Sequence, residues 1–371
     1  MLHVLLLLAC AVTIYFACEW FINAVEWLGV ELKVGPLAVG TVLAATGTAL
    51  PESIVTLVAA LFGGAGQGND IAVGAAMGGP LVVGTIAYGV TGAMLLWRRR
   101  CLPHPAHGVR PTEAPPAAEH TTAVSAQTNK ESQGVDAAGR LIGVDTAHLA
   151  RDQRWFLTIF IFQVALGLVA FALKPWLGLL FFTAFAVYFR RQTRSTGEQT
   201  RSTGEHASAE DLEPLKLQPR RTTPTRAAVL TQVAVTLGLI FGSSQLFVDQ
   251  LEWAGPALGL PSVVVALLLS PVATELPEIM NAIIWVRQGK TQLALANISG
   301  AMMIQATVAS GIGILLTPWM FDTPLVLAGL TTIVSVAYLL WLLRHDRFTA
   351  ARLTAAAGLY AVFAVALVLT L

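Results

Sequence analysis

Charged residues are scarce in this sequence. Asp, Glu, Lys and Arg make up 12% of its 371 residues, about half the share found in soluble proteins, while 55% of the residues are apolar. Cysteine is also scarce. Cys10 and Cys18 lie in an apolar run and Cys101 in a polar segment, which excludes a disulfide framework. The net charge of +1 says nothing by itself. The composition indicates a chain embedded in a membrane rather than a soluble domain.

Long apolar runs recur along the chain, and about 18 apolar residues are enough to cross roughly 30 Å of hydrocarbon as a helix. The runs lie at residues 2–28, 34–62, 70–97, 155–173, 175–190, 227–249, 259–287, 292–316, 324–343 and 350–371. They predict an all-α membrane protein with ten transmembrane helices. Only Lys174 and Pro175 separate the fourth run from the fifth, so these two are expected to form a hairpin. The first run lacks a basic N-terminal region and stays apolar past Trp20, which favours a retained helix over a cleaved signal peptide.

The basic residues are distributed unevenly among the loops. If ten spans start outside the cell, the loops after spans one, three, five, seven and nine lie in the cytoplasm. These loops hold Lys33, Arg98, Arg99, Arg100, Arg151, Arg154, Arg190, Arg191, Arg220, Arg221, Arg226, Arg287, Lys290, Arg344, Arg347 and Arg352. The loops on the opposite side hold only Lys174. By the positive-inside rule, we expect an integral protein of the cell (inner) membrane with its N- and C-termini outside.

Two polar segments interrupt the apolar runs. Residues 101–154 and residues 191–226 are expected to be disordered cytoplasmic linkers, because neither has an apolar period. The first begins with Cys101, His104 and His107, whose spacing could hold a metal ion. A fourth ligand and an ordered scaffold are lacking there, so we predict no metal site in this segment.

The two halves of the chain resemble each other. A shift of 226 residues aligns about 30 positions without a gap and places Leu50-Pro51-Glu52 on Leu276-Pro277-Glu278. Five spans precede the second copy, and since five is odd, that copy must enter the membrane from the opposite side. The sequence therefore predicts two inverted five-helix repeats. Residues 1–100 hold the first repeat with spans 1–3, residues 155–190 hold spans 4–5, and residues 227–371 hold the second repeat with spans 6–10.

Each repeat places a carboxylate directly after a proline in the middle of an apolar run. Glu52 follows Pro51, and Glu278 follows Pro277. A charge buried at this depth costs roughly 3 kcal/mol or more unless something offsets it. The same costly feature occurs at matched places of both repeats, which points to a duplicated ion site.

Further oxygen atoms accompany each glutamate. Thr48 and Thr274 lie four residues before Glu52 and Glu278, on the same helical face. Each proline also frees a backbone carbonyl four residues back, because proline has no N–H to donate. Brought together, the two repeats would form an oxygen cage of the kind that hard cations such as Ca²⁺ prefer. The alternative is a pair of structural kinks whose glutamates pair with other helices.

Glu275 breaks the symmetry of the two repeats, because its counterpart is Ala49. It precedes Glu278 by three residues, so the two carboxylates share a helical face. Two close acids cannot both ionise cheaply. Glu275 is therefore a proton carrier or an added cation ligand, unless it pairs with a neighbouring helix away from the site.

Other acids in the apolar runs are weaker candidates. Glu19 lies opposite Gln245 in the repeat, and that residue is not acidic. Glu26 lies at the end of a span beside a tryptophan, where the membrane interface is the ordinary location. Neither is assigned to the ion site.

These motifs resemble those of the sodium/calcium exchanger superfamily of cation/Ca²⁺ antiporters. The resemblance covers roughly residues 15–97 and 235–316 and includes both copies of the family's Gly-Thr-Ser-x-Pro-Glu element. It implies that Glu52 and Glu278 bind the transported cation. It also implies that the region of Thr48 and Thr274 contributes oxygens.

The sequence departs from the family pattern around these motifs. Positions that carry a serine or an amide in the family lack it here, at Ala49, Gly79, Val83, Glu275 and Ala301. Asn297 and Gln305 remain as polar ligands. A site rich in carboxylate and poor in hydroxyl suits a divalent cation or a proton better than Na⁺.

We therefore expect a secondary-active antiporter that exchanges Ca²⁺ for H⁺ or Na⁺, and not an enzyme. We expect no resident cofactor, because the cation is cargo, and the expected partners are small inorganic cations and the lipid bilayer, not nucleic acid. The alternative is a non-transporting cation sensor or assembly protein on the same scaffold. An intramembrane hydrolase is disfavoured, since no serine or cysteine is spaced with a base and every histidine except His3 lies in a loop.

Overall fold

The computed structural model describes residues 2–32, 39–62, 69–101, 134–136, 139–203, 212–257, 268 and 270–370. In chain order the helices are α1 (Leu2–Glu31), η1 (Val39–Ala44), α3 (Ala45–Phe62), α4 (Asn69–Val82), η3 (Val83–Ala87), α5 (Tyr88–Cys101), α6 (Thr146–Gly167), α7 (Lys174–Thr203), α8 (Arg226–Ala257), α10 (Ser270–Thr274), α11 (Leu276–Arg287), α12 (Thr291–Ile304), η6 (Gln305–Ala309), α13 (Ser310–Leu316), α14 (Thr323–Arg344) and α15 (Ala350–Thr370), where η marks a π-helix. Two short strands, β1 (Gly134–Val135) and β2 (Leu141–Ile142), pair antiparallel.

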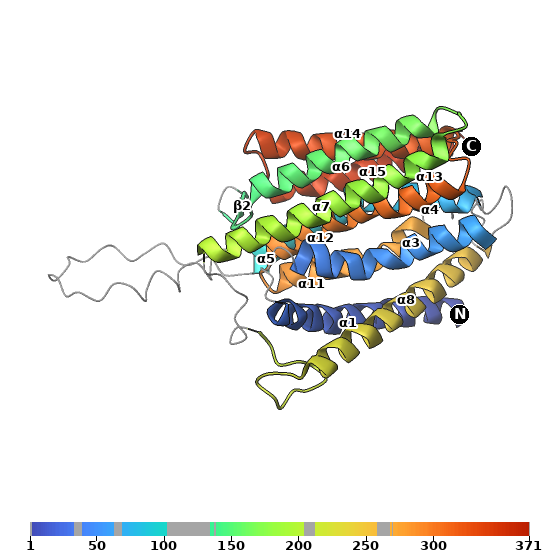
Figure 1. Ribbon diagram of the computed structural model, residues 1–371. Helices are drawn as coiled ribbons and strands as arrows, with labels where there is room; N and C mark the ends of the chain where they lie inside the picture. Colours follow the sequence, from blue (N-terminus) through green and yellow to red (C-terminus); the bar gives the residue numbers. More distant parts are fainter. Residues whose placement is uncertain are drawn as a thin grey trace, which may run out of the picture.

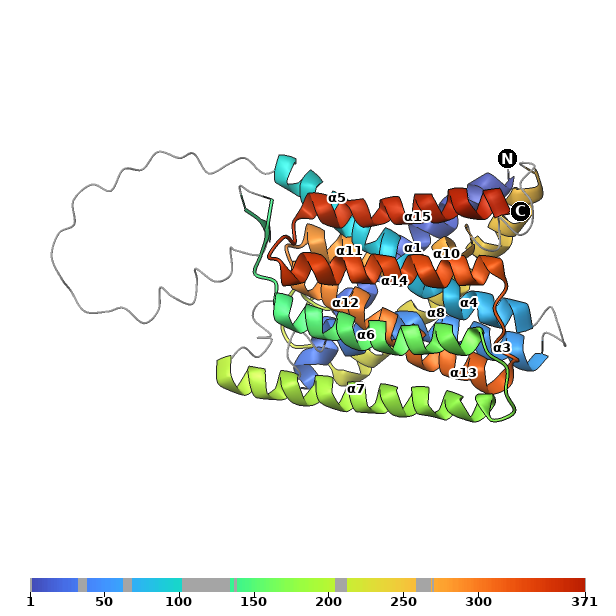
Figure 2. The same cartoon turned by 90° about the horizontal axis from the view of Figure 1, so that it is seen from above.

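The helices run along one common direction and form a bundle (Figure 1). α1 and α8 pack against each other along one side, and they reach the centre through contacts with α10, α11 and η1. α3, α4, α11 and α12 occupy the centre, while α6, α14 and α15 lie on the side away from α1 (Figure 1). Both chain termini lie at the same end of the bundle, as Figure 2 also shows.

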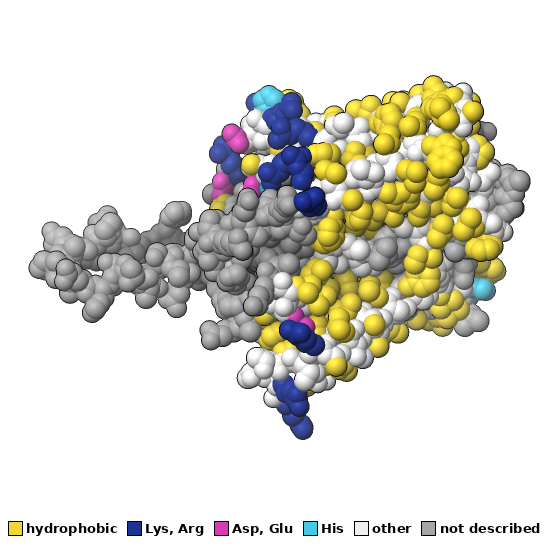
Figure 3. Space-filling view, in the orientation of Figure 1, with side chains coloured by type: hydrophobic (Ala, Val, Ile, Leu, Met, Phe, Trp, Pro, Cys, Tyr) yellow, Lys and Arg dark blue, Asp and Glu magenta, His cyan; other side chains and the backbone are white. Residues whose placement is uncertain are grey.

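The surface of the bundle separates apolar from basic side chains. Figure 3 shows hydrophobic side chains covering the flank, with Lys and Arg gathered at the end opposite the termini. Large apolar side chains are well exposed, including Leu8 at 61% and Leu369 at 80%. Arginines occupy the last turns of α5, α11 and α14. An apolar flank of this extent suits lipid rather than water.

Fewer helices meet the requirements for a membrane span than the ten that the sequence predicts. Six helices in the described part of the chain are long and apolar enough, or seven if the bent pair 39–49 and 52–62 counts as one span. The expected spans 155–173 and 175–190 fall on α6 and α7, which also carry polar turns. The expected span 259–287 is interrupted, because α10 and α11 are two short helices. The fold is thus a helical membrane bundle, and the ten-helix count stays a prediction.

The structure differs from the expected disorder of the two linkers. In the first, residues 139–154 are part of the fold. Helix α6 begins there at Thr146, and the Asp145 carboxylate caps it by accepting from the His148 N–H at 2.8 Å. In the second, helix α7 continues through residues 191–203 rather than stopping at 190. Residues 102–133 and 204–211, which include His104 and His107, lie outside the described residues.

Residues 212–217 of the second linker dock between α1 and α8. The Asn23 side chain of α1 accepts from the Lys216 N–H at 3.0 Å, and the Trp27 indole donates to the Glu213 carbonyl at 2.9 Å. From α8, the Gln232 side chain accepts from Leu217 N–H at 2.8 Å and donates to the Trp20 carbonyl of α1 at 2.9 Å. This segment, called the docked segment below, therefore joins the two helices.

Glu26 contributes a further bond between α1 and the rest of the bundle. Its carboxylate pairs with Lys290 at 2.5 Å and accepts from the Trp285 indole at 3.1 Å. Only 9% of Glu26 is exposed. Glu26 is thus a buried partner of the turn between α11 and α12, and its expected location at the membrane interface stays a prediction.

Lys174 is the one basic residue expected in the loops on the side opposite the cytoplasm. It is buried, and its ammonium group is hydrogen-bonded. Its ammonium group donates to the carbonyls of Val169 and Trp319 at 2.6 and 2.7 Å. It is the first residue of α7, and its bonds satisfy carbonyls of the loops that follow α6 and α13. Its place away from the basic end follows from this local role.

We predict that Leu215 is the apolar anchor of the docked segment. Its side chain is fully buried against Ala24, Trp27 and Val229. Leu215→Ala should weaken docking by about 2 kcal/mol or more, because Leu→Ala in a core leaves a cavity. Limited trypsin digestion of the purified protein should then cleave after Lys216 much faster than in the wild type.

Leu217→Ala is the matched control, because Leu217 lies in the same segment but is 48% exposed. It should leave the rate of cleavage after Lys216 close to that of the wild type. Equal rates in the two variants would show that the segment is not anchored by Leu215.

Candidate cation site

Helices break at both Pro-Glu motifs. In the first copy, residues 39–49 and 52–62 form two helical segments bent by 43° at the intervening Pro51. In the second copy, α10 ends at Thr274 and α11 begins at Leu276, so the break falls on Glu275. Proline causes such kinks because its ring removes one N–H and crowds the preceding turn. The two breaks turn the motif side chains toward the centre of the bundle.

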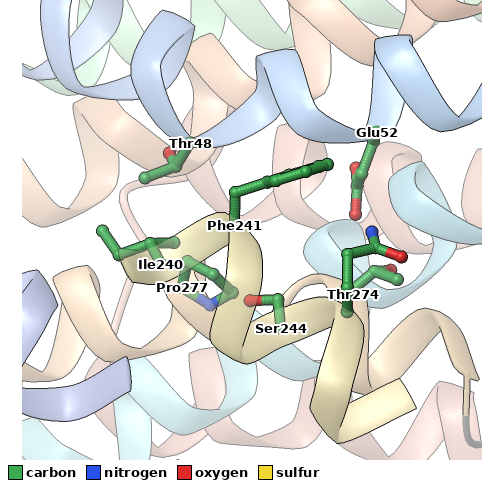
Figure 4. Close-up of a pocket in the computed structure, with 8 residues that line it drawn as sticks. Thr48, Glu52, Ile240, Phe241, Ser244, Thr274 and Pro277 are labelled. Atoms are coloured by element: carbon green, nitrogen blue, oxygen red, sulfur yellow. The ribbon is translucent and has the colours of Figure 1, made fainter. Parts of the chain in front are cut away.

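A pocket joins the two copies to α8. It is lined by Thr48, Glu52, Ile240, Phe241, Ser244, Gln245, Thr274 and Pro277. In Figure 4, the Phe241 ring extends from α8 between Thr48 and Glu52, and Thr274 lies near Glu52, on the side of the ring away from Thr48. Three predicted site residues from the two repeats thus share one pocket. The α8 residues that line it were not predicted, although the pairing of Gln245 with Glu19 in the repeat had marked that position.

Gln305 connects two of the carboxylates. Its side-chain Nε2 donates to Glu52 Oε2 and to Glu275 Oε1, each at 2.7 Å. Glu275 and Gln305 are buried, and 7% of Glu52 is exposed. The single amide nitrogen of Gln305 therefore donates to one carboxylate from each half of the chain. Gln305 is also the first residue of the π-helix η6, and η3 begins at Val83, the position paired with it in the family pattern.

Several buried oxygens at this place lack a hydrogen-bond partner. They are Glu52 Oε1, Glu275 Oε2, both Glu278 carboxylate oxygens and Gln305 Oε1. Within the described ranges, none of these three carboxylates pairs with a Lys, Arg or His side chain. Unpaired buried carboxylates are strongly unfavourable, and a bound cation or a proton is what offsets such a charge where no basic side chain is near.

Glu278 differs from the other two acids in that Gln305 does not bond to it. It is fully buried in the first turn of α11. Among the described residues, no three Asp, Glu, His or Cys side chains converge with ligand geometry. The hydroxyls of Thr48 and Thr274 meanwhile donate to the carbonyls of Ala44 and Pro271 at 3.1 Å.

Asn297 is not brought to the pocket. It lies two turns before Gln305 on α12, against η1 at Gly40. Its side chain is buried and neither polar atom has a hydrogen-bond partner. The structure thus gathers six of the seven predicted ligands around the helix breaks and places the seventh on the η1 side of α12.

Comparison with known proteins identifies relatives by sequence. The profile of the family described as sodium/calcium exchanger protein matches residues 2–105 and 228–371, which is more than half of the chain. The chain is also similar to CaxA, a proposed antiporter of Alkalimonas amylolytica, with 30% identity over 100 residues. That similarity spans 27% of this chain and only 31% of the length of CaxA.

The fold has counterparts among solved structures. The sodium-calcium exchanger NCX_Mj soaked without Na⁺ and Ca²⁺ superposes with a TM-score of 0.67 at 16% identity, covering 99% of both chains. NCX_Mj soaked with 2.5 mM Na⁺ and 10 mM Sr²⁺ gives a TM-score of 0.66 at 17% identity over 97% of both chains. The fold likeness and the family profile agree, and the chain belongs to the sodium/calcium exchanger family.

Proposed function

We propose that this protein is a secondary-active antiporter that moves Ca²⁺ in exchange for H⁺ or Na⁺ across the cell (inner) membrane. One observation carries the proposal above all others. Glu52 and Glu278, from matched places of the two halves, are buried at helix breaks with oxygens that no protein group satisfies. An exchanger needs such a site, because oxygens of the protein must replace the water molecules that the ion loses when it enters the membrane.

In the proposed mechanism, Glu52 and Glu278 hold the ion near the middle of the membrane. Thr48 and Thr274 add hydroxyl oxygens, and Gln305 can offer the side-chain oxygen that has no partner in this structure. The proposal includes ten spans in two inverted five-helix repeats, with both termini outside. Matched π-helices at Val83 and Gln305 support the repeat.

Alternating access is assigned to the α1–α8 pair. These helices pack on each other, and α8 closes one side of the pocket with Ile240, Phe241 and Ser244. Because the docked segment joins them, they would tilt together against the helices that carry the acids. Movement of one bundle against a fixed site is the common device of transporters built from inverted repeats.

A second candidate is a non-transporting cation sensor or assembly protein on the same scaffold. The favouring observation is the loss of side-chain oxygens at Gly79, Ala301 and Val83, where the family pattern has serine or amide groups. Cation binding measured by calorimetry, without flux in liposomes, would select this candidate over the antiporter.

The antiporter proposal predicts that flux depends on both glutamates. Glu52→Gln and Glu278→Gln should each lower Ca²⁺ uptake into inside-out vesicles by at least about tenfold, because loss of one charged ligand costs more than about 1.4 kcal/mol. Glu19→Gln is the matched control, a neutralised acid of α1 that does not line the pocket. Wild-type uptake in both site variants would refute the assignment.

The counter-ion is tested separately in proteoliposomes. The carboxylate-rich, hydroxyl-poor site favours H⁺, so a proton gradient alone should drive Ca²⁺ uptake, with opposite proton movement reported by a fluorescent pH dye. A Na⁺ gradient alone should drive little uptake. Uptake that follows the Na⁺ gradient and ignores the proton gradient would assign Na⁺ instead. Mn²⁺ in place of Ca²⁺ tests whether other divalent cations are carried.

A further inference from the structure

Glu275 occupies space that depends on the absence of a side chain at residue 79. A Cβ added to Gly79 on α4 would lie 2.6 Å from Glu275 Oε1 and 3.0 Å from the Gln305 side chain. Real Cβ contacts are essentially never shorter than 3.0 Å. A side chain at residue 79 would therefore require the Glu275 carboxylate, at the end of its flexible side chain, to move away from this position. Gly79 and Glu275 form one complementary pair from the two halves of the chain.

The pair places the Glu275 carboxylate next to that of Glu52. Glu275 Oε1 and Glu52 Oε2 bind the same Gln305 nitrogen, so they lie within twice 2.7 Å of each other. The second oxygen of Glu275 is fully buried and has no partner, as is the case for both oxygens of Glu278. These unpartnered, buried atoms distinguish the place from an acidic cluster on a surface, where water would satisfy them.

The number of carboxylates bears on which cations the site prefers. Electrostatic attraction grows with the product of the charges and is strengthened where water is excluded. A carboxylate added beside Glu52 favours a doubly charged cation over Na⁺ more strongly than Glu52 and Glu278 would without it. Carboxylate oxygen is also the preferred ligand of hard divalent cations.

We propose that Glu275, accommodated by Gly79, is a specificity-determining residue that shifts the preference of the site from monovalent to divalent cations. This inference rests on the proposed cation site of Glu52 and Glu278 and adds its substrate class. The residues that set the preference are then one acid on the α10–α11 break and one glycine on α4.

The experiment measures binding of radioactive ⁴⁵Ca²⁺ to the full-length purified protein, with Na⁺ as competitor. Glu275→Gln keeps the size of the side chain and removes its charge. We expect Ca²⁺ affinity to fall by about tenfold or more, because one negative charge near the ion is lost. We also expect Na⁺ to displace Ca²⁺ at a lower Na⁺ concentration than in the wild type. Thermal unfolding and gel filtration establish that each variant is folded.

Substitutions at residue 79 test the pairing. Gly79→Ser should displace the Glu275 carboxylate and reproduce the loss of Ca²⁺ preference. In the Gly79→Ser/Glu275→Ser double variant, the smaller residue 275 removes the clash, so the double variant should bind Ca²⁺ no worse than Glu275→Ser alone. Gly74→Ser is the matched control on α4, because a Cβ there meets no atom within 4 Å. It should bind Ca²⁺ and Na⁺ like the wild type.

The outcomes separate this inference from the proposed function. If Glu275→Gln keeps the wild-type ratio of Ca²⁺ to Na⁺ affinity, while Glu52→Gln abolishes Ca²⁺ binding, the role of Glu275 is refuted and the site stands. Additive effects of the Gly79 and Glu275 substitutions would refute the pairing. If the wild type binds no Ca²⁺, both the proposed function and this inference fail.

Discussion

Three carboxylates buried without a positively charged side chain impose the constraint on which the centre of this structure depends. Burial of one such group is costly, and burial of three together is tolerated only if protons, amides or metal ions compensate the charge. In the described part of the chain, one amide, that of Gln305, bonds two of them, and several oxygens stay unsatisfied. The packing of the surrounding helices must therefore offset the electrostatic free energy that burial of Glu52, Glu275 and Glu278 costs.

Irregular backbone makes the cluster geometrically feasible. The bend of 43° at Pro51 and the break at Glu275 lie beside the buried acids Glu52, Glu275 and Glu278. The π-helices η3 and η6 each insert an extra residue into a turn beside them. Close packing of small residues completes the arrangement. A Cβ on Gly300 would meet the Thr41 carbonyl at 2.3 Å, so α12 and η1 approach each other almost backbone to backbone.

The sequence predicted which acids lie near the helix breaks better than it predicted the contacts that they make. Costly glutamates after prolines were visible in the sequence, because burial of charge in an apolar run has few explanations. The amide bridge of Gln305 was not, since a hydrogen bond between residues 52 and 305 depends on tertiary packing. Asn297 lies in α12, about two turns before Gln305 at the start of η6, and periodicity alone could not tell which of the two amides meets the acids.

The fold could be predicted to a similar extent. Apolar runs and the placement of arginines indicated a helical membrane bundle, whose apolar flank and basic end follow from solvation. Linker composition was misleading near residues 212–217. That segment is polar on average, but its single buried Leu215 and its backbone bonds to Asn23 and Gln232 are enough to order it. Average composition cannot detect order that depends on one side chain and a few hydrogen bonds.

The docked segment couples the linker mechanically to the helices beside the pocket. It bonds to α1 and α8 at once, whereas Glu26 bonds α1 to the turn between α11 and α12 through Lys290. A bound protein or a chemical modification at residues 212–217 would thus act directly on α1 and α8. The linker that joins α7 to α8 has a direct physical route by which events in its surroundings could change the speed of exchange.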